Sequence, residues 1–195
     1  MLGVILTLAC SSELDNKPRA RIGDDVSTNS KEQIGEAKWN LQPNSKVEWV
    51  GSKVSLDHQG GFERTQGFVV VNNGNLIELM AEFEVASLFS DHPKLTKHLL
   101  EPDFFDVEAF PKSSFVMKSY TSSKDTGEMI GVLTLKGVSK SIVFPAQVSI
   151  EASKALVVAE FTINRKEFNM NYAGRANDLI RDDVLIKVQM HYSAQ

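Results

Sequence analysis

The sequence has only one cysteine, Cys10, among 195 residues, which excludes an internal disulfide. No apolar run reaches the roughly 20 residues that span a bilayer as a helix. Lysine and arginine form no block interleaved with aromatic residues, and the net charge is −4, so nucleic acid is not expected as a partner. What is present, 42% hydrophobic and 24% charged residues, is ordinary for a globular domain with one core.

Motifs for catalysis are missing as well. No G-x-S-x-G nucleophile elbow occurs, and no glycine-rich phosphate loop follows a strand. His98 with Asp103 and Asp106 would suit a hydrolase, although carboxylates beside a helix end are more often solvated or capping groups. No metal site is predicted, because no carboxylate or cysteine lies at ligand spacing from the four histidines, His58, His92, His98 and His191. We therefore predict a protein that is not an enzyme, with no catalytic residue, no metal and no cofactor.

The N-terminus divides into two segments. Residues 1–9 (MLGVILTLA) are apolar and end in a small residue directly before Cys10. This resembles the end of a bacterial lipoprotein signal peptide, in which Cys10 would become an acylated membrane anchor. The alternative is an apolar N-terminus with an incidental cysteine. Residues 10–36 are polar, of mixed charge and without a period, so they predict a flexible tether.

From residue 37 to residue 195 the chain alternates between apolar and polar residues, the pattern of strands with one dry face. The sequence N-N-G-N at residues 72–75 predicts a tight hairpin turn. Pro145 lies within one strand and predicts an edge or a bulge there. The predicted inward positions include Val54 and Leu56, then Ile77, Leu79, Ala81, Phe83 and Val85, and near the C-terminus Val184, Ile186, Val188, Met190 and Tyr192.

One stretch, Leu95–Pro111 (LTKHLLEPDFFDVEAFP), interrupts this pattern. Asp91 is the expected cap of a short helix with Pro93 in its first turn, and Pro102 should end that helix. The Phe104–Phe105 pair that follows predicts an apolar lid or plug.

About eight antiparallel strands are predicted, joined mostly by hairpin-length turns and carrying one helical insertion. Such strands form either a closed barrel or a two-sheet sandwich, and the pattern alone does not choose between them. The inward apolar residues likewise fit either a filled core or a slot for an apolar chain.

Four motifs in order resemble the YceI-like family, bacterial periplasmic proteins also called polyisoprenoid-binding. They cover the chain from about Trp39 to the C-terminus. They are Trp49–Gly61 (WVGSKVSLDHQGG) with Phe62 and Gly67–Phe68, Leu95–Pro111 with Phe115, Gly131–Lys140 (GVLTLKGVSK) with Phe144–Pro145, and Phe161–Phe168 (FTINRKEF). Two places depart from the family pattern: Asn169–Met170 stands where many members have a glycine, and the segment Lys53–Gln59 differs.

The resemblance implies an all-β, eight-stranded antiparallel lipocalin-like barrel with an elongated apolar cavity. It further implies binding, storage or transport of a long-chain isoprenoid or similar lipid in the bacterial envelope, as a periplasmic or outer-envelope lipoprotein. The alternative is a non-catalytic envelope stress or scaffold module with a filled core. Whether two chains pair as a homodimer stays open. The predicted lining is Phe68, Phe83, Phe115, Leu133, Phe144, Phe161 and Met190, with Leu99, Phe104 and Phe105 closing the cavity.

Overall fold

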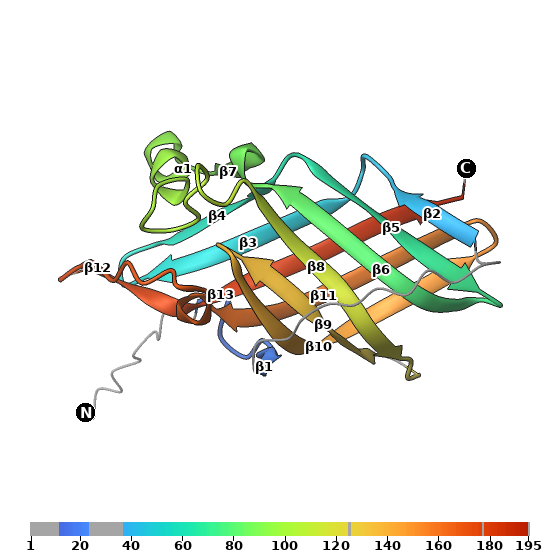
Figure 1. Ribbon diagram of the computed structural model, residues 1–195. Coiled ribbons are helices and arrows are strands. Elements are labelled where there is room, and N and C mark those ends of the chain that lie inside the picture. The colour runs from blue at the N-terminus through green and yellow to red at the C-terminus, as the bar shows by residue number, and fades with distance from the viewer. Residues whose placement is uncertain (1–11, 24–36, 125, 177, 195) are drawn as a thin grey trace, which may run out of the picture.

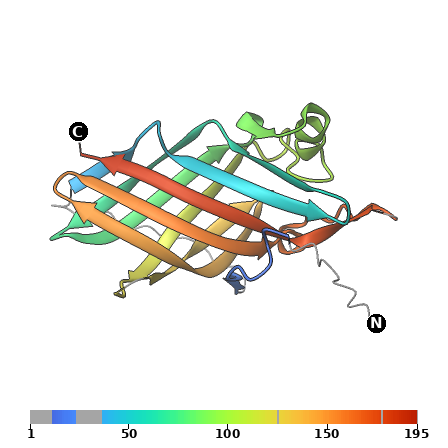
Figure 2. The ribbon, with the colours of Figure 1, turned by 180° about the vertical axis from the view of Figure 1, so that it is seen from behind.

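The computed structural model describes residues 12–23, 37–124, 126–176 and 178–194. The predicted signal-peptide-like segment, Cys10 and residues 24–36 lie outside these ranges. Within them, eight strand courses form one closed antiparallel barrel with a short helix at one end (Figures 1 and 2). The prediction of an all-β barrel with a helical insertion is therefore confirmed, and the sandwich alternative is wrong.

The courses follow one another around the barrel in sequence order. The first three are each broken into two collinear strands, and the other five are single strands. They are β2 (Ala37–Leu41) with β3 (Lys46–Lys53), β4 (Asp57–Phe62) with β5 (Thr65–Asn72), β6 (Asn75–Glu84) with β7 (Leu88–Ser90), β8 (Lys112–Thr121), β9 (Gly127–Leu135), β10 (Val138–Glu151), β11 (Lys154–Asn164) and β13 (Asp178–Ser193). β13 closes the ring by pairing with both β2 and β3.

Two strands differ from the simple alternation. A register shift opposite Val70 and Val71 turns Leu76 inward and leaves Ile77 37% exposed, so the predicted inward position of Ile77 is wrong. Val54 and Leu56 were also expected to face inward, but they lie at the tip between β3 and β4, 78% and 54% exposed. A bulge or a turn shifts the side-chain period by one residue, which alternation alone does not reveal.

The predicted hairpin turn at residues 72–75 is confirmed. Asn73 and Gly74 both have positive φ angles, 49° and 75°, between β5 and β6. Two successive left-handed residues match the right-handed twist of a hairpin, and Asn-Gly is the pair that adopts them most readily.

The expectation of a flexible tether is wrong for residues 12–23, which pack on the barrel wall. Leu14 is buried against Val50 and Leu185, which face outward from β3 and β13. The short β1 (Arg21–Ile22) pairs with β10, and the Ala20 amide donates to the Thr162 carbonyl oxygen of β11 at 2.8 Å. These residues fill a gap between β10 and β11 and satisfy backbone groups that would otherwise lack partners.

Pro145 marks the place where β10 exchanges neighbours. β10 pairs with β11 from Ala146 onward and with β1 at Ile142 and Val143. Because proline has no N–H to donate, it fits between the two ladders, consistent with the edge or bulge predicted there.

The helical insertion lies between β7 and β8 at one end of the barrel (Figure 1). α1 (Pro93–Leu99) is capped by His92, whose side chain accepts from the Lys94 amide, so the predicted cap at Asp91 is wrong. Asp91 instead pairs with His58 of β4 at 2.9 Å. The helix ends before Pro102, as expected. No helix among the described residues combines the length and apolar character needed to cross a membrane.

Side chains fill the barrel at the end opposite α1. Figure 1 shows that the C-terminus lies at this end. There Trp39, Val71, Leu76, Met117 and Tyr192 are all buried in one cluster. None of these five side chains lines the cavity that occupies the other end. The barrel is therefore a tube closed at the C-terminal end, and its open end lies beside α1.

Candidate functional site

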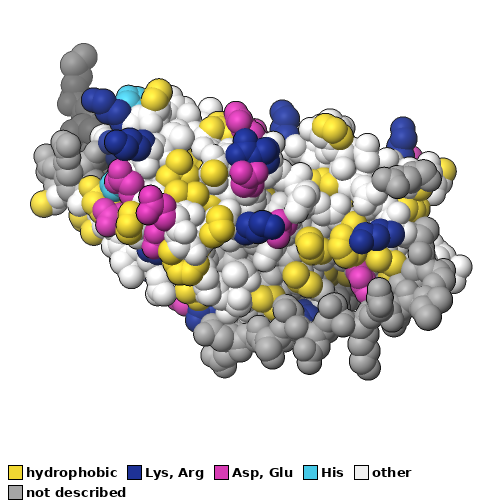
Figure 3. All heavy atoms as spheres, turned by 45° about the horizontal axis from the view of Figure 1, so that its top comes forward, with side chains coloured by type: hydrophobic (Ala, Val, Ile, Leu, Met, Phe, Trp, Pro, Cys, Tyr) yellow, Lys and Arg dark blue, Asp and Glu magenta, His cyan; other side chains and the backbone are white. Residues whose placement is uncertain are grey.

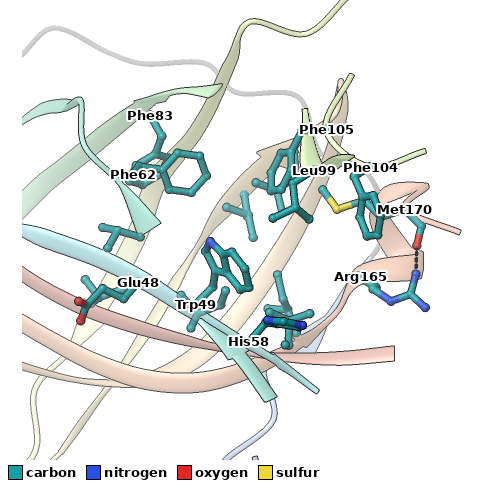
Figure 4. A pocket seen from close by; sticks show the side chains of 18 of the residues that line it. Glu48, Trp49, His58, Phe62, Phe83, Leu99, Phe104, Phe105, Arg165 and Met170 are labelled. Carbon is teal, nitrogen blue, oxygen red and sulfur yellow. Dashed lines mark hydrogen bonds between the residues drawn. The ribbon is translucent and has the colours of Figure 1, made fainter. Parts of the chain in front are cut away.

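A cavity of about 700 Å³ occupies the α1 half of the barrel, and its lining is predominantly apolar (Figure 4). This volume is within the range of pockets that enclose a small-molecule ligand. Strands β3, β4, β6, β8, β9, β10, β11 and β13 contribute its walls, with α1 and the loop after it above them.

Nine of the ten predicted lining residues line this cavity: Phe83, Leu99, Phe104, Phe105, Phe115, Leu133, Phe144, Phe161 and Met190. Phe68 does not, and its prediction is wrong. Val69 and Val71 face the core from β5, so the neighbouring Phe68 points outward, where the Lys38 ammonium lies 3.8 Å from its ring centroid. Four consecutive apolar residues in β5 made the inward face ambiguous in the sequence.

Three aromatic rings form an apolar surface within the cavity, which we call the aromatic floor, and Val157 and Met190 line the cavity further toward the closed end. Phe144 and Phe161 are stacked with centroids 4.1 Å apart, and Phe115 meets Phe144 edge-on at 5.5 Å. Gly131 makes room for this group, because a Cβ atom there would lie 2.3 Å from Cζ of Phe115. The floor is therefore a rigid apolar surface without hydrogen-bonding side chains.

Trp49 crosses the middle of the cavity, and the sequence analysis did not single it out as lining (Figure 4). Its cross-strand neighbour is Gly60, where a Cβ atom would lie 2.6 Å from the indole Cζ2 and 2.0 Å from the Phe89 carbonyl oxygen. The Trp49 Nε1 atom has no hydrogen-bond partner among the described residues. The signal in the sequence was a tryptophan followed by a glycine pair in the next strand. Recognising Trp49 as a lining residue from that signal requires the register between the two strands.

The helix and its loop close part of the opening. Leu99 and Phe104 are buried in one cluster with Leu88, and Phe105 packs edge-on against Phe62 at 6.0 Å. Both phenylalanines of the predicted lid line the cavity (Figure 4). Phe104 and Phe105 therefore form part of the cavity wall as well as closing part of its opening.

His98 connects the lid to the opposite wall. Its ring lies edge-on to Phe104 at 5.0 Å and to Tyr172 at 4.7 Å, and Nε2 is 3.3 Å from Asp103. Asp106 has a positive φ of 53° in the loop and is hydrogen-bonded through its backbone to Glu101 and Phe110. His98 and Asp103 thus form a partly exposed pair at the surface. Through the contact of the His98 ring with Tyr172, this pair connects α1 to the segment around Tyr172.

Arg165 is the charged residue most deeply buried at this end, with 3% exposed. It donates to the carbonyl oxygens of Met170 and Arg181 and to Asp182 Oδ1. Burial lowers the pKa of the guanidinium, and the Asp182 carboxylate acts in the opposite direction. Arg165 therefore fixes the segment that carries Met170, which itself lines the cavity.

The departure at Asn169 has a simple conformational basis. Asn169 caps the short 3₁₀ helix η2 (Arg165–Phe168) with a φ of 58°, in the left-handed region. Glycine and asparagine are the residues that adopt this conformation at helix ends, so Asn169 suits the position at which a glycine was expected.

Polar groups gather at the opening of the cavity. Lys53, His58, His92, Lys94 and Tyr172 contribute to the lining there. Among the described residues no group of three or more histidine, cysteine, aspartate or glutamate side chains is placed to hold a metal ion. The arrangement offers an apolar interior and a polar entrance.

Comparison with known proteins decides the family. The family model described as "YceI-like domain" matches residues 39–192. The chain belongs to the YceI-like family. Two curated relatives, both UPF0312 proteins, come from Pseudomonas putida strain F1 (29% identical over 117 residues, 56% of this chain) and Pseudomonas savastanoi pv. phaseolicola (30% over 114 residues, 55% of this chain). The matches span 61% and 59% of those relatives' lengths.

Solved structures of the YceI-like fold superpose on the barrel. Burkholderia cenocepacia BcnA gives a TM-score of 0.68 at 20% identity and covers 75% of this chain and 95% of its own. A polyisoprenoid binding domain from Saccharophagus degradans, implicated in plant cell wall breakdown, gives 0.67 at 13% identity with 83% and 100% coverage. The Campylobacter jejuni YCEI protein gives 0.55 at 19% identity with 97% of both chains covered. At these identities the likeness establishes the fold.

Proposed function

We propose that this protein binds a long-chain isoprenoid or a similar lipid in the barrel cavity and stores or transports it without chemical change. The observation that carries the proposal is the continuous apolar cavity of about 700 Å³, which a filled-core scaffold would lack. Membership in the YceI-like family supports the same class of ligand. The alternative of a scaffold with a filled core does not fit the hollow α1 half of the barrel.

The driving force is burial of apolar surface. Each buried methylene contributes about 0.8 kcal/mol. The end of the chain that enters first would pass the aromatic floor and reach Val157 and Met190. A ligand lying this way keeps its polar end near Lys53, His58 and Lys94 at the opening. Removing the lipid from a membrane and ordering its tail offset most of the gross gain.

We also propose that the protein works in the bacterial envelope as a lipoprotein anchored through Cys10. The apolar residues 1–9 followed by Cys10 support this. The test is the distribution of the chain and its Cys10→Ser variant between membrane and soluble fractions. Release of the variant is the expected result, and retention would contradict acylation at Cys10.

Ligand binding is tested by native mass spectrometry of protein purified without added lipid, followed by extraction. A co-purifying long-chain lipid is expected, and its absence together with no uptake of added polyprenol would contradict the proposal. Tryptophan fluorescence gives a second measurement, since the chain has two tryptophans and only Trp49 lines the cavity. A quinone-bearing isoprenoid should quench Trp39→Phe protein strongly and Trp49→Phe protein weakly.

A further inference from the structure

Three exposed apolar side chains lie together at the open end of the barrel. They are Val54, Leu56 and Leu179, which are 78%, 54% and 52% exposed, and we call them the apolar rim. The Val54 amide donates to the Leu179 carbonyl oxygen at 3.2 Å, so the β3–β4 turn and the start of β13 are held side by side. Exposed apolar side chains that gather in one patch mark an interaction site more often than single exposed ones do.

The apolar rim is continuous with the cavity. Leu56 lines the cavity itself, as do Lys53 and Ile180, the residues adjoining Val54 and Leu179 in sequence. An apolar ligand that leaves the cavity over this edge therefore passes Leu56 and Ile180 on its way to the rim, beside the Lys53 side chain.

The N-terminal segment points at the same place. Ser12, the first described residue, lies with its hydroxyl 2.8 Å from that of Ser52 and 3.3 Å from Asp57, on either side of the rim turn. Asp15 then pairs with Arg181 at 2.8 Å, two residues after Leu179. Cys10 precedes Ser12 by two residues, which an extended chain spans in about 7 Å. An acyl chain on Cys10 would thus enter a membrane beside the rim.

Charged groups border the apolar rim without covering it. Lys94 and Lys97 are exposed on α1, as are the acids Glu101 and Glu108 in the loop after it, while Asp91 and Asp103 are paired with histidines. Figure 3 shows side chains of both signs beside hydrophobic ones on the face that carries α1. Charged side chains bordering an apolar patch suit the headgroup region of a bilayer.

We propose that the open end of the barrel docks on a lipid bilayer, with Val54, Leu56 and Leu179 inserted between headgroups and the cavity facing the membrane. This rests on the proposed lipid binding, and it adds where the ligand is exchanged. Lipid then moves between bilayer and cavity without crossing water, which removes the main kinetic obstacle for a long apolar chain.

The test uses the Cys10→Ser chain and vesicles of phosphatidylcholine with one fifth phosphatidylglycerol, chosen as the experimental mixture. The rim variant carries Val54→Ser, Leu56→Ser and Leu179→Ser, and the control carries Ile77→Ser and Val158→Ser, which are 37% and 36% exposed on the barrel side. The rim variant should bind vesicles at least about tenfold more weakly, because it loses three inserting side chains, while the control should not change.

Residues 1–9 also bring the chain to vesicles, so a second measurement identifies the face in contact. An environment-sensitive dye on Leu56→Cys, in the Cys10→Ser chain, should brighten and shift to the blue on vesicles, and the same dye on Ile77→Cys should not. Equal responses at both sites would overturn the proposal. So would a rim variant that binds vesicles like its parent but changes from dimer to monomer, since the rim would then join two copies of the chain.

The proposed lipid binding and the proposed membrane docking can be refuted independently of each other. A variant with only Val54→Ser and Leu179→Ser, neither of which lines the cavity, should still take up detergent-dispersed polyprenol, read by displacement of a quinone-bearing isoprenoid that quenches Trp49. It should acquire polyprenol from vesicles at least about tenfold more slowly. If neither parent nor variant binds dispersed polyprenol, the proposed function is wrong while the dye result still decides docking. If both acquire lipid from vesicles at the same rate, the docking proposal is wrong and the lipid-binding proposal stands.

Discussion

Replacing Ala159 with phenylalanine separates a hollow barrel from a filled one. Ala159 is buried on β11, and its side chain lines the cavity. If the space is hollow, the new ring enters it and buries apolar surface, which should raise the free energy of unfolding of the empty protein by ~1–2 kcal/mol. For a domain of this size that raises the melting temperature by ~3–6 °C.

The same change should weaken ligand binding. The ring takes the place of roughly six ligand carbons at ~0.8 kcal/mol each, an upper limit of ~5 kcal/mol or roughly 4000-fold in affinity. A flexible chain retracts toward the opening and recovers part of this loss. We therefore expect the affinity for polyprenol to fall by roughly 10- to 1000-fold, measured by displacement of a quinone-bearing isoprenoid that quenches Trp49. Short prenols that do not reach the floor should be affected least.

Ala155→Phe is the matched control. Ala155 is two alternations away on the same face of β11, is equally buried, and lies in the solid end outside the cavity. Overpacking there should destabilise the protein by ~1–3 kcal/mol. Both variants are compared by thermal unfolding after lipid has been extracted. If Ala159→Phe lowers the melting temperature as much as Ala155→Phe does, the space is filled in solution and the reasoning from the cavity is refuted.

Two further predictions concern buried polar groups. Arg165→Met should lower the free energy of unfolding, measured by urea titration, by ~2–4 kcal/mol, because the Met170 and Arg181 carbonyl oxygens lose their donor. The control Lys166→Met breaks only an exposed ion pair with Asp182. It should lower the free energy of unfolding by less than ~1 kcal/mol in the same titration. Burial raises the pKa of the Tyr192 phenol, so stability should be full below about pH 10, where the unfolded phenol titrates, and fall by up to ~1.4 kcal/mol per pH unit above it. Tyr192→Phe should flatten that decline, and an unchanged slope would show that another group causes it.

The fold was predictable because most strands carry an unbroken alternation. In β8, β10 and β13 the inward residues named from the sequence, such as Phe115, Phe144 and Met190, are buried in the core. The alternation of side chains along a strand is a local property, so it can be read from the sequence without knowing which strands pair. Where a bulge or a turn shifts the period, as at Ile77 and Val54, the local pattern gives the wrong face.

Contacts between distant segments were not predictable from local pattern. Residues 12–23 look like a tether because they have no period, yet they lie in a gap of the wall between β10 and β11. Their positions depend on unpaired backbone groups around Thr162 and on the outward Leu185, neither of which is visible before the barrel is assembled. Trp49 was missed as a lining residue for the same reason, since its place follows from its register with Gly60.

The position of the hollow within the barrel follows from side-chain size rather than from alternation. An eight-stranded barrel is just narrow enough for inward side chains to fill it. In the C-terminal half Trp39, Leu76 and Tyr192 do so. In the α1 half Ala81 and Ala159 are inward on β6 and β11 and line the cavity, while Gly131 of β9 makes room for the Phe115 ring. Since the tube is closed at one end by large side chains, a chain must enter tail first from the α1 end, and the depth of the cavity sets the longest tail that can be fully buried.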